Sequence, residues 1–178
     1  QLGVEVHSLV IRIGSAAWEP PEGELSAHRE AAEQSDVRCP DPTTAAAMRA
    51  AIDAAQKAGD TLGGTFVVVV TGLPTGLGSY VEWDRKLDGR LAQAVMSIHA
   101  VKAVEIGLGV ESGRRPGSAV HDEISFDANQ RRGSSGGFLR RTNHAGGLEG
   151  GVTNGAELIV RGTMKPIATL ARPLQSVN

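Results

Sequence analysis

Valine and isoleucine dominate the start of the chain and predict a β-strand over residues 3–13. The segment reads GVEVHSLVIRI, and β-branched runs of this kind favour extended structure. Its apolar positions change parity, because Val4 and Val6 give way to Leu9 and Ile11. Since neighbouring residues of a strand point to opposite faces, this change predicts either a β-bulge or burial of both faces.

The clearest helical pattern covers residues 41–58. Asp41 is suited to the N-cap and Pro42 to the first helical position. Gly59 is suited to the left-handed residue that often closes a helix. The apolar face is narrow and consists of Met48, Ile52 and Ala55.

The middle and the end of the chain alternate between strand-like and helix-like spacing of apolar residues. Residues 65–73 (TFVVVVTGL) are apolar on both parities, which predicts a strand covered on both faces. After a turn at 74–79, apolar residues repeat every three or four positions and predict a helix from about 84 to 102. This stripe consists of Leu87, Leu91, Val95, Ile98 and Val101. A last strand is predicted over 158–164, so the pattern favours mixed α and β structure.

Other stretches show neither the helical nor the strand spacing of apolar residues. Residues 15–40 contain Trp18, three prolines and many charges, and are interpreted as a long surface excursion. The Ser, Gly and Arg run at 131–137 is interpreted as a mobile loop. The length of 178 residues and the absence of a repeat indicate a single domain over 1–178.

Composition and charge restrict the class of ligand and the cellular compartment that are expected. Residues 1–100 carry 8 basic and 13 acidic side chains, whereas residues 101–178 carry 10 basic and 7 acidic ones. The positive half also holds the glycine clusters, which favours a phosphate-bearing small molecule over a nucleic acid. Cys39 is the only cysteine, and no apolar run is long enough for a membrane span. A soluble protein of a reducing, cytosolic compartment is expected. Both ends of the sequence look cut, so a fragment is expected.

Glycines and cations are the first candidates for binding chemistry. Five glycines lie between 146 and 155, and such a density lets backbone N–H groups approach a phosphate. A set of tight turns is the alternative interpretation. Lys165 precedes Pro166 and could present a fixed ammonium, or it could be a solvated residue at a strand end. The arginine pairs 114/115, 131/132 and 140/141 could clamp a phosphate.

The histidines give no catalytic or metal-binding pattern by themselves. Their spacing is not that of metal ligands. His99 falls off the apolar stripe and is interpreted as a polar helix residue. The triplet from His121 to Glu123 is interpreted as solvated loop.

Six segments, in the same order, resemble the chorismate synthase family. They are GDTLGG at 59–64, GLPTGLGS at 72–79, LDGRLAQAVMSIHAVKAVEIG at 87–107, GSAVHDE at 117–123, RTNHAGGLEGGVTNG at 141–155 and MKPIAT at 164–169. The strand GVEVHSLVIRIGS also fits the family. The resemblance spans nearly the whole chain except residues 15–40.

The resemblance implies a fold and a reaction. The fold is α+β, a β-α-β sandwich of two antiparallel sheets enclosing helices, of which this chain would supply about half. The reaction is the anti-1,4-elimination of phosphate from 5-enolpyruvylshikimate 3-phosphate, which gives chorismate at the end of the shikimate pathway. Reduced FMN is required, and NADPH is associated with the family. A cytoplasmic homotetramer is implied for the full-length enzyme, with no nucleic-acid or membrane partner.

Family contacts to FMN map onto three parts of this sequence. They are His99 with Ala100, Gly150, and the segment Lys165, Pro166, Ile167, Ala168 and Thr169. Three positions depart from the family pattern. His99 stands where an amide is common, Ala168 where Ser is frequent, and Ala103 where Gly is usual.

The family's catalytic residues are expected outside this sequence. Its two catalytic histidines would precede Gln1, and its conserved acidic residue would follow Asn178. The chain is therefore expected to contain no catalytic residue and to be inactive alone. Three hypotheses stay open: a segment of the enzyme, a non-catalytic flavin or phosphate-binding module, and an oligomerisation domain whose glycines serve turns.

Overall fold

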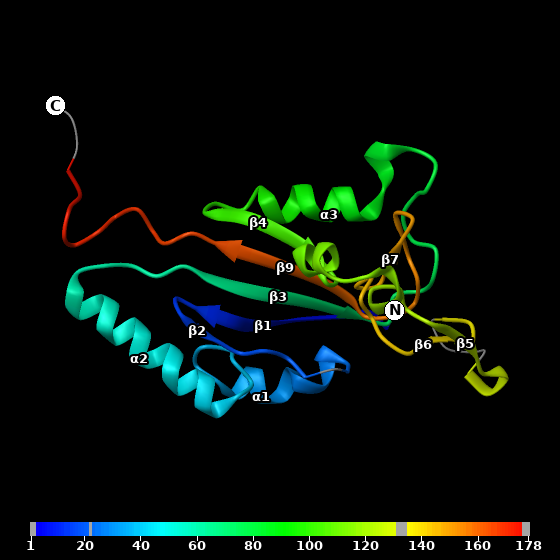
Figure 1. The fold of residues 1–178 in the computed structure, drawn as a ribbon, viewed down its shortest axis with the longest axis horizontal. Helices are drawn as coiled ribbons and strands as arrows, with labels where there is room; N and C mark the ends of the chain where they lie inside the picture. Colours follow the sequence, from blue (N-terminus) through cyan, green and yellow to red (C-terminus); the bar gives the residue numbers. More distant parts are fainter. Residues whose placement is uncertain (1–2, 22, 131–134, 176–178) are drawn as a thin grey trace.

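A computed structural model describes residues 3–21, 23–130 and 135–175, and its main feature is one antiparallel sheet. The strand order across this sheet is β2-β1-β3-β9-β4. Figure 1 shows α1 and α2 alongside the β1 and β2 edge, and α3 beside β4. The strands are β1 (Glu5–Ile13), β2 (Ala16–Ala17), β3 (Gly64–Thr71), β9 (Leu158–Met164) and β4 (Val101–Ile106).

The pairing of β1 with β3 has one irregularity, which lies beyond the parity change predicted from Val6 and Leu9. The register runs from Glu5 opposite Thr71 to Val10 opposite Phe66, and then shifts so that Arg12 lies opposite Thr65. A strand with an extra residue switches the face to which its later side chains point. A bulge is thus present in β1, but it does not account for the parity change, which lies before it: Val6 is exposed and Leu9 is buried on a continuous stretch of pairing.

One face of the sheet carries an apolar core that the N-terminal segment covers. Its buried residues are Leu9, Leu25, Ala32, Val67, Val69 and Ile159. Leu25 and Ala32 belong to η1 (Leu25–His28) and α1 (Arg29–Gln34). The interpretation of 15–40 as a surface excursion is therefore wrong in part, because this segment supplies buried side chains. The apolar positions of this short amphipathic stretch are hard to recognise in the sequence because charged residues surround them.

The helix α2 (Pro42–Ala58) has the ends that the sequence predicts. Asp41 accepts a hydrogen bond of 2.6 Å from the backbone nitrogen of Thr44, and Gly59 has a φ of 70°. Cys39, Ala45 and Met48 form a second buried cluster against Val10 and Ile13 of β1. The capping residues thus fix the length of α2, and its short apolar face joins it to the edge of the sheet.

The opposite face of the sheet packs against α3 (Leu87–Met96), which follows η2 (Trp83–Arg85). Leu87, Leu91 and Val95 contact a buried cluster of Leu148, Leu158 and Val160, as the apolar stripe predicts. The predicted extension of this helix to residue 102 is wrong. Ala100 adopts a φ of 70°, and Val101 already begins β4. The helix already ends at Met96, a left-handed residue at position 100 cannot belong to it, and the β-branched Val101 is suited to a strand.

The remaining elements form a lobe of short helices and two-residue to three-residue strands. They are η3 (Gly109–Arg114), η4 (Gly117–Ala119), β5 (Ile124–Phe126), η5 (Ala128–Gln130), β6 (Phe138–Arg140), β7 (Leu148–Glu149) and β8 (Val152–Thr153). The loop predicted at 131–137 falls mostly on 131–134, which lie outside the described residues. Across the described ranges, the helices lack the length and apolar character that a membrane crossing needs.

Candidate functional site

His99 and Ala100 lie in the tight turn between α3 and β4, and not within a helix. Ala100 has a φ of 70°, which is uncommon for a residue with a side chain. Its carbonyl oxygen accepts a hydrogen bond of 2.9 Å from the backbone nitrogen of Lys165. The end of β9 therefore holds this turn in its left-handed conformation.

Residues 165–169 follow β9 and run beside the segment that precedes β3. Thr61 Oγ1 donates a hydrogen bond of 2.7 Å to the carbonyl oxygen of Ile167. A Cβ atom at Gly63 would lie 3.0 Å from Pro166 Cδ, so glycine is needed for this close approach. The side chains from Lys165 to Thr169 are all exposed. The backbone of this segment is thus anchored while its side chains face outward.

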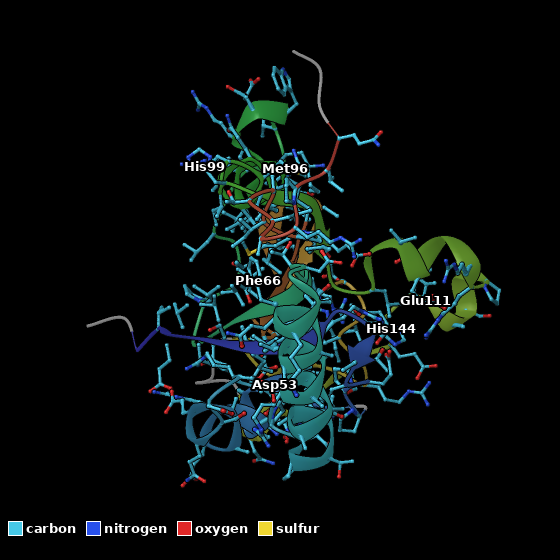
Figure 2. The ribbon with its side chains drawn as sticks, turned by 90° about the vertical axis from the view of Figure 1, so that its left-hand side faces the viewer. Asp53, Phe66, Met96, His99, Glu111 and His144 are labelled. Atoms are coloured by element: carbon cyan, nitrogen blue, oxygen red, sulfur yellow. The ribbon has the colours of Figure 1, made fainter. Side chains whose placement is uncertain are left out.

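The structure therefore brings together two of the three predicted site segments. His99 is exposed at one end of α3, and Figure 2 shows it near Met96. Lys165 brings an ammonium group to the same turn, whereas Thr169 lies further along a segment that runs past Thr61 toward Gly59. The imidazole and the ammonium group can both donate hydrogen bonds, which is the chemistry that an anionic ligand requires.

Gly150 lies at the other end of α3. It forms the tip of the hairpin between β7 and β8, with a φ of 62° and no atom within 4 Å of an added Cβ position. The backbone nitrogen of Leu87, at the start of α3, donates 2.8 Å to the carbonyl oxygen of the adjacent Gly151. Because the ten residues of α3 span about 15 Å, Gly150 does not join the Ala100 turn.

A groove of about 1040 Å³ lies on the face of the sheet that carries Ile159, Arg161 and Thr163. The sequence does not predict this groove. Figure 2 shows Glu111 and His144, which both line it, on the same side of the molecule. The groove is mixed in charge, since arginine and glutamate side chains both line its walls.

The arginine pairs in and beside this groove already have carboxylate partners. Arg114 and Arg115 contact Glu111 at 3.3 and 3.4 Å, and Arg141 contacts Glu123 at 3.1 Å. Arg140 pairs with Glu149 and also donates 3.2 Å to the carbonyl oxygen of Asn154. A bidentate phosphate clamp would have to displace these partners. The pair at 131 and 132 lies outside the described residues.

Asp122 is the residue whose role the sequence pattern misses. Its side chain is 1% exposed and accepts hydrogen bonds from Thr142 Oγ1 (2.5 Å), His144 N (2.8 Å) and Ala145 N (3.0 Å). Burial alone would raise the pKa of this carboxyl group, but these hydrogen bonds outweigh burial and lower it. The interpretation of residues 121–123 as solvated loop is wrong for Asp122, because its partners lie twenty residues further along the chain.

Within the described ranges, His, Cys, Asp and Glu side chains form no group of three that could hold a metal ion. Cys39 is buried and free. The candidate site therefore consists of the cationic turn at Ala100 and, separately, the exposed hairpin tip at Gly150.

Comparison with known proteins gives one consistent result. The model of the chorismate synthase family matches residues 1–178. Proteins named chorismate synthase from Geobacter metallireducens and Symbiobacterium thermophilum are 54% and 53% identical over 177 residues. These alignments cover 99% of this chain but only 45% and 44% of the two relatives. The chain thus spans about half the length of the curated relatives it matches.

A solved structure leads to the same family. The structure titled "Crystal Structure of Chorismate Synthase" matches with a TM-score of 0.84 and 42% identity, over 93% of this chain and 50% of that one. At this identity and coverage the likeness extends to the fold as a whole. The expected α+β architecture, and the expectation that the chain supplies about half of the family fold, are confirmed.

Proposed function

This chain belongs to the chorismate synthase family, and we propose that the complete protein containing it catalyses the family reaction. The reaction is the anti-1,4-elimination of phosphate from 5-enolpyruvylshikimate 3-phosphate to chorismate, with reduced FMN as cofactor. The proposal extends to a cytoplasmic homotetramer and to NADPH as the source of reducing equivalents. The present chain contributes part of the cofactor wall.

The observation that carries the proposal is the junction between the Ala100 turn and the start of 165–169. The two segments are 65 positions apart in sequence and meet through the hydrogen bond from Lys165 N to Ala100 O. The family resemblance predicts both segments as FMN contacts. A turn that keeps a non-glycine residue at positive φ costs about 1–3 kcal/mol, and such strain concentrates at ligand sites.

The residue types at these positions would suit a phosphorylated flavin. The Lys165 ammonium would attract its phosphate or an electron-rich edge of its ring, and the Thr169 hydroxyl would add a hydrogen bond. His99 would donate a hydrogen bond where the family commonly has an amide. At the other end of α3, Gly150 leaves its backbone open to close approach, since no atom lies within 4 Å of its Cβ position.

Bound reduced flavin would supply electron density to the breaking C–O bond. The residues of this chain would orient the flavin and keep its anionic groups neutralised. Groups that move the proton are proposed to lie in the other half of the protein. The 178-residue chain is therefore expected to bind flavin weakly and to form no chorismate by itself.

An anaerobic titration tests the proposal. The chain and the complete protein are each titrated with reduced FMN in the presence of the phosphorylated substrate, and flavin absorbance is followed. We expect saturable binding that Lys165→Ala weakens roughly tenfold through the loss of one charge-assisted contact. Gly150→Val should weaken it by a similar factor, because a branched side chain strains the positive φ and blocks close approach of the ligand to the backbone.

Two control variants match these substitutions. Lys57→Ala removes an exposed ammonium from α2, and Gly136→Val alters a glycine that has a φ of 64° and the same open surroundings as Gly150. Both controls should bind flavin as the unmodified protein does. Equal losses in the controls, or no chorismate from the complete protein, would overturn the proposal. Flavin binding without turnover by the complete protein would favour the non-catalytic module instead.

A further inference from the structure

The carboxylate of Asp122 holds the beginning of the glycine-rich segment 141–155. One of its oxygen atoms accepts from Thr142 Oγ1 and His144 N, and the other accepts from Ala145 N. The His144 ring stays close, with Nδ1 at 3.0 Å from the carbonyl oxygen of Val120. Three donors therefore converge on a single buried anion.

The other side of this segment is joined to the sheet. The backbone nitrogen of Ile159 donates 3.0 Å to the carbonyl oxygen of Gly146, and Leu108 N donates 2.9 Å to that of His144. A Cβ atom at Gly107 would lie 2.6 Å from Gly146 N, so the two backbones are in direct contact. The segment is thus fixed between Asp122 and the ends of β4 and β9.

This fixation continues to the hairpin tip. Asn143 Oδ1 accepts 2.9 Å from Gly147 N, and Asn154 N donates 3.0 Å to the carbonyl oxygen of Gly147. Leu148 then pairs with Thr153, and the hairpin closes at Gly150. Hydrogen bonds therefore fix the backbone at several successive points between the residues that Asp122 binds and Gly150.

The chemistry at position 122 requires a carboxylate. An ionised aspartate only accepts hydrogen bonds, and here it meets three donors. An asparagine would turn its NH₂ group toward at least one of these donors and leave a buried N–H without a partner. At the same time Asp122 lies between η4 and β5, outside the main sheet. Its replacement should therefore disturb 141–155 before it disturbs the sheet.

We propose that Asp122 is the positioning residue that sets the conformation in which Gly150 meets the cofactor. This inference rests on the proposed function, because it takes Gly150 as a flavin contact. Asp122 acts through the backbone of 141–147 and through the hairpin, without touching the ligand. The class of ligand is a phosphorylated flavin, and the property that Asp122 controls is its affinity.

Steady-state kinetics of the complete protein gives the decisive measurement. For Asp122→Asn we expect the FMN concentration that gives half-maximal rate to rise about tenfold, while kcat at saturating FMN changes less than about twofold. A role limited to global stability would instead lower the fraction of active protein, so kcat would fall and the half-maximal concentration would stay. That pattern would overturn the proposal, as would an unchanged affinity.

Hydrogen exchange provides a second measurement, which does not depend on flavin. In Asp122→Asn the amides of 141–155 should exchange at least about tenfold faster, while those of β3 keep their protection. Thr142→Val, which removes one of the three donors, should give a smaller effect of the same kind if the asparagine variant folds poorly. Asp53→Asn, an exposed position on α2, is the matched control (Figure 2).

The kinetic and the hydrogen-exchange measurements together distinguish a failure of the inference about Asp122 from a failure of the proposed function on which it rests. Failure of the unmodified complete protein to bind FMN would overturn the proposed function, and the exchange arm would still decide whether Asp122 holds the segment. Exchange in 141–155 that is the same in the Asp122 variants and in the Asp53 control would overturn the inference even if FMN binds well.

Discussion

The backbone nitrogen of Lys165 lies 2.9 Å from the carbonyl oxygen of Ala100, and this hydrogen bond joins the end of β9 to the turn that starts β4. Val101 pairs with Met164 immediately beside it. The left-handed Ala100 is thus held directly beside the paired backbone of β4 and β9. A cationic residue and a strained turn consequently occupy one small surface.

The strain at Ala100 gives a first prediction. Ala100→Gly should raise the free energy of unfolding by roughly 0.5–1 kcal/mol, since glycine reaches positive φ without a steric cost. Ala54→Gly, at an exposed position inside α2, should instead lower it by about 1 kcal/mol. Urea unfolding of both variants measures the two values. A loss at both positions would show that the backbone of the turn is not strained.

The contact between Phe66 and Gly162 gives a second prediction. The Phe66 ring lies over the backbone of Gly162, and an added Cβ would come within 2.8 Å of its Cε1 atom. Gly162→Ala should therefore destabilise the chain by about 1–3 kcal/mol through overpacking. In a Phe66→Leu background the same change should cost clearly less. Additive effects in this double-mutant cycle would mean that the ring does not occupy this position.

Buried His7 gives a third prediction, on pH. Both ring nitrogens lack a hydrogen-bond partner among the described residues, and burial lowers the pKa of His7 from 6.5, with Glu157 opposing the shift. The unfolded chain therefore takes up a proton at a higher pH than the folded chain does. Stability from this residue is complete above about pH 6.5 and is lost as the pH falls through the window between 6.5 and the lowered value.

His7→Leu removes this dependence. The difference in unfolding free energy between variant and unmodified chain should shift in favour of the variant between about pH 7.5 and pH 5.5. Urea denaturation at the two pH values measures it. A difference that does not change with pH would contradict a lowered pKa at His7.

Asp122 gives a fourth prediction, in a separate pH window. Because its pKa is lowered in the folded chain, the stabilisation it contributes is present above its unfolded value of about 3.9 and is lost as the pH falls through the folded value. Protection of the 141–155 amides, corrected for intrinsic exchange, should therefore decline only below about pH 4. The same decline beginning near neutral pH would point to a different titrating group.

The sequence predicts elements best where local chemistry decides them. The limits of α2 follow from Asp41 and Gly59, which act within one turn of the helix. The parity of Val6 and Leu9 does not locate the bulge in β1, since the register shifts only between Val10 and Arg12. The end of α3 was not predictable in this way, because the turn at Ala100 depends on Lys165, far along the chain.

The candidate site also combines features that local sequence predicts with features that depend on distant residues. Lys165 and the segment after it could be assigned from motif resemblance, because their residue types recur in the family in the same order. Asp122 carries no local signal, since its three donors come from residues 142–145 and burial cannot be read from a polar triplet. The distance between Gly150 and the Ala100 turn was equally hidden, because it depends on the direction in which α3 packs.

The position of β9 has a consequence for how the protein is made. This strand lies between β3 and β4, yet it is the last strand of the described chain to leave the ribosome. Until residue 158 emerges, the β1–β3 pair and the α3–β4 unit have no common partner, and each presents an open strand edge. Pairing across such long sequence separations is slow. While residues 107–157 are being synthesised, these open edges are therefore available for pairing with other chains.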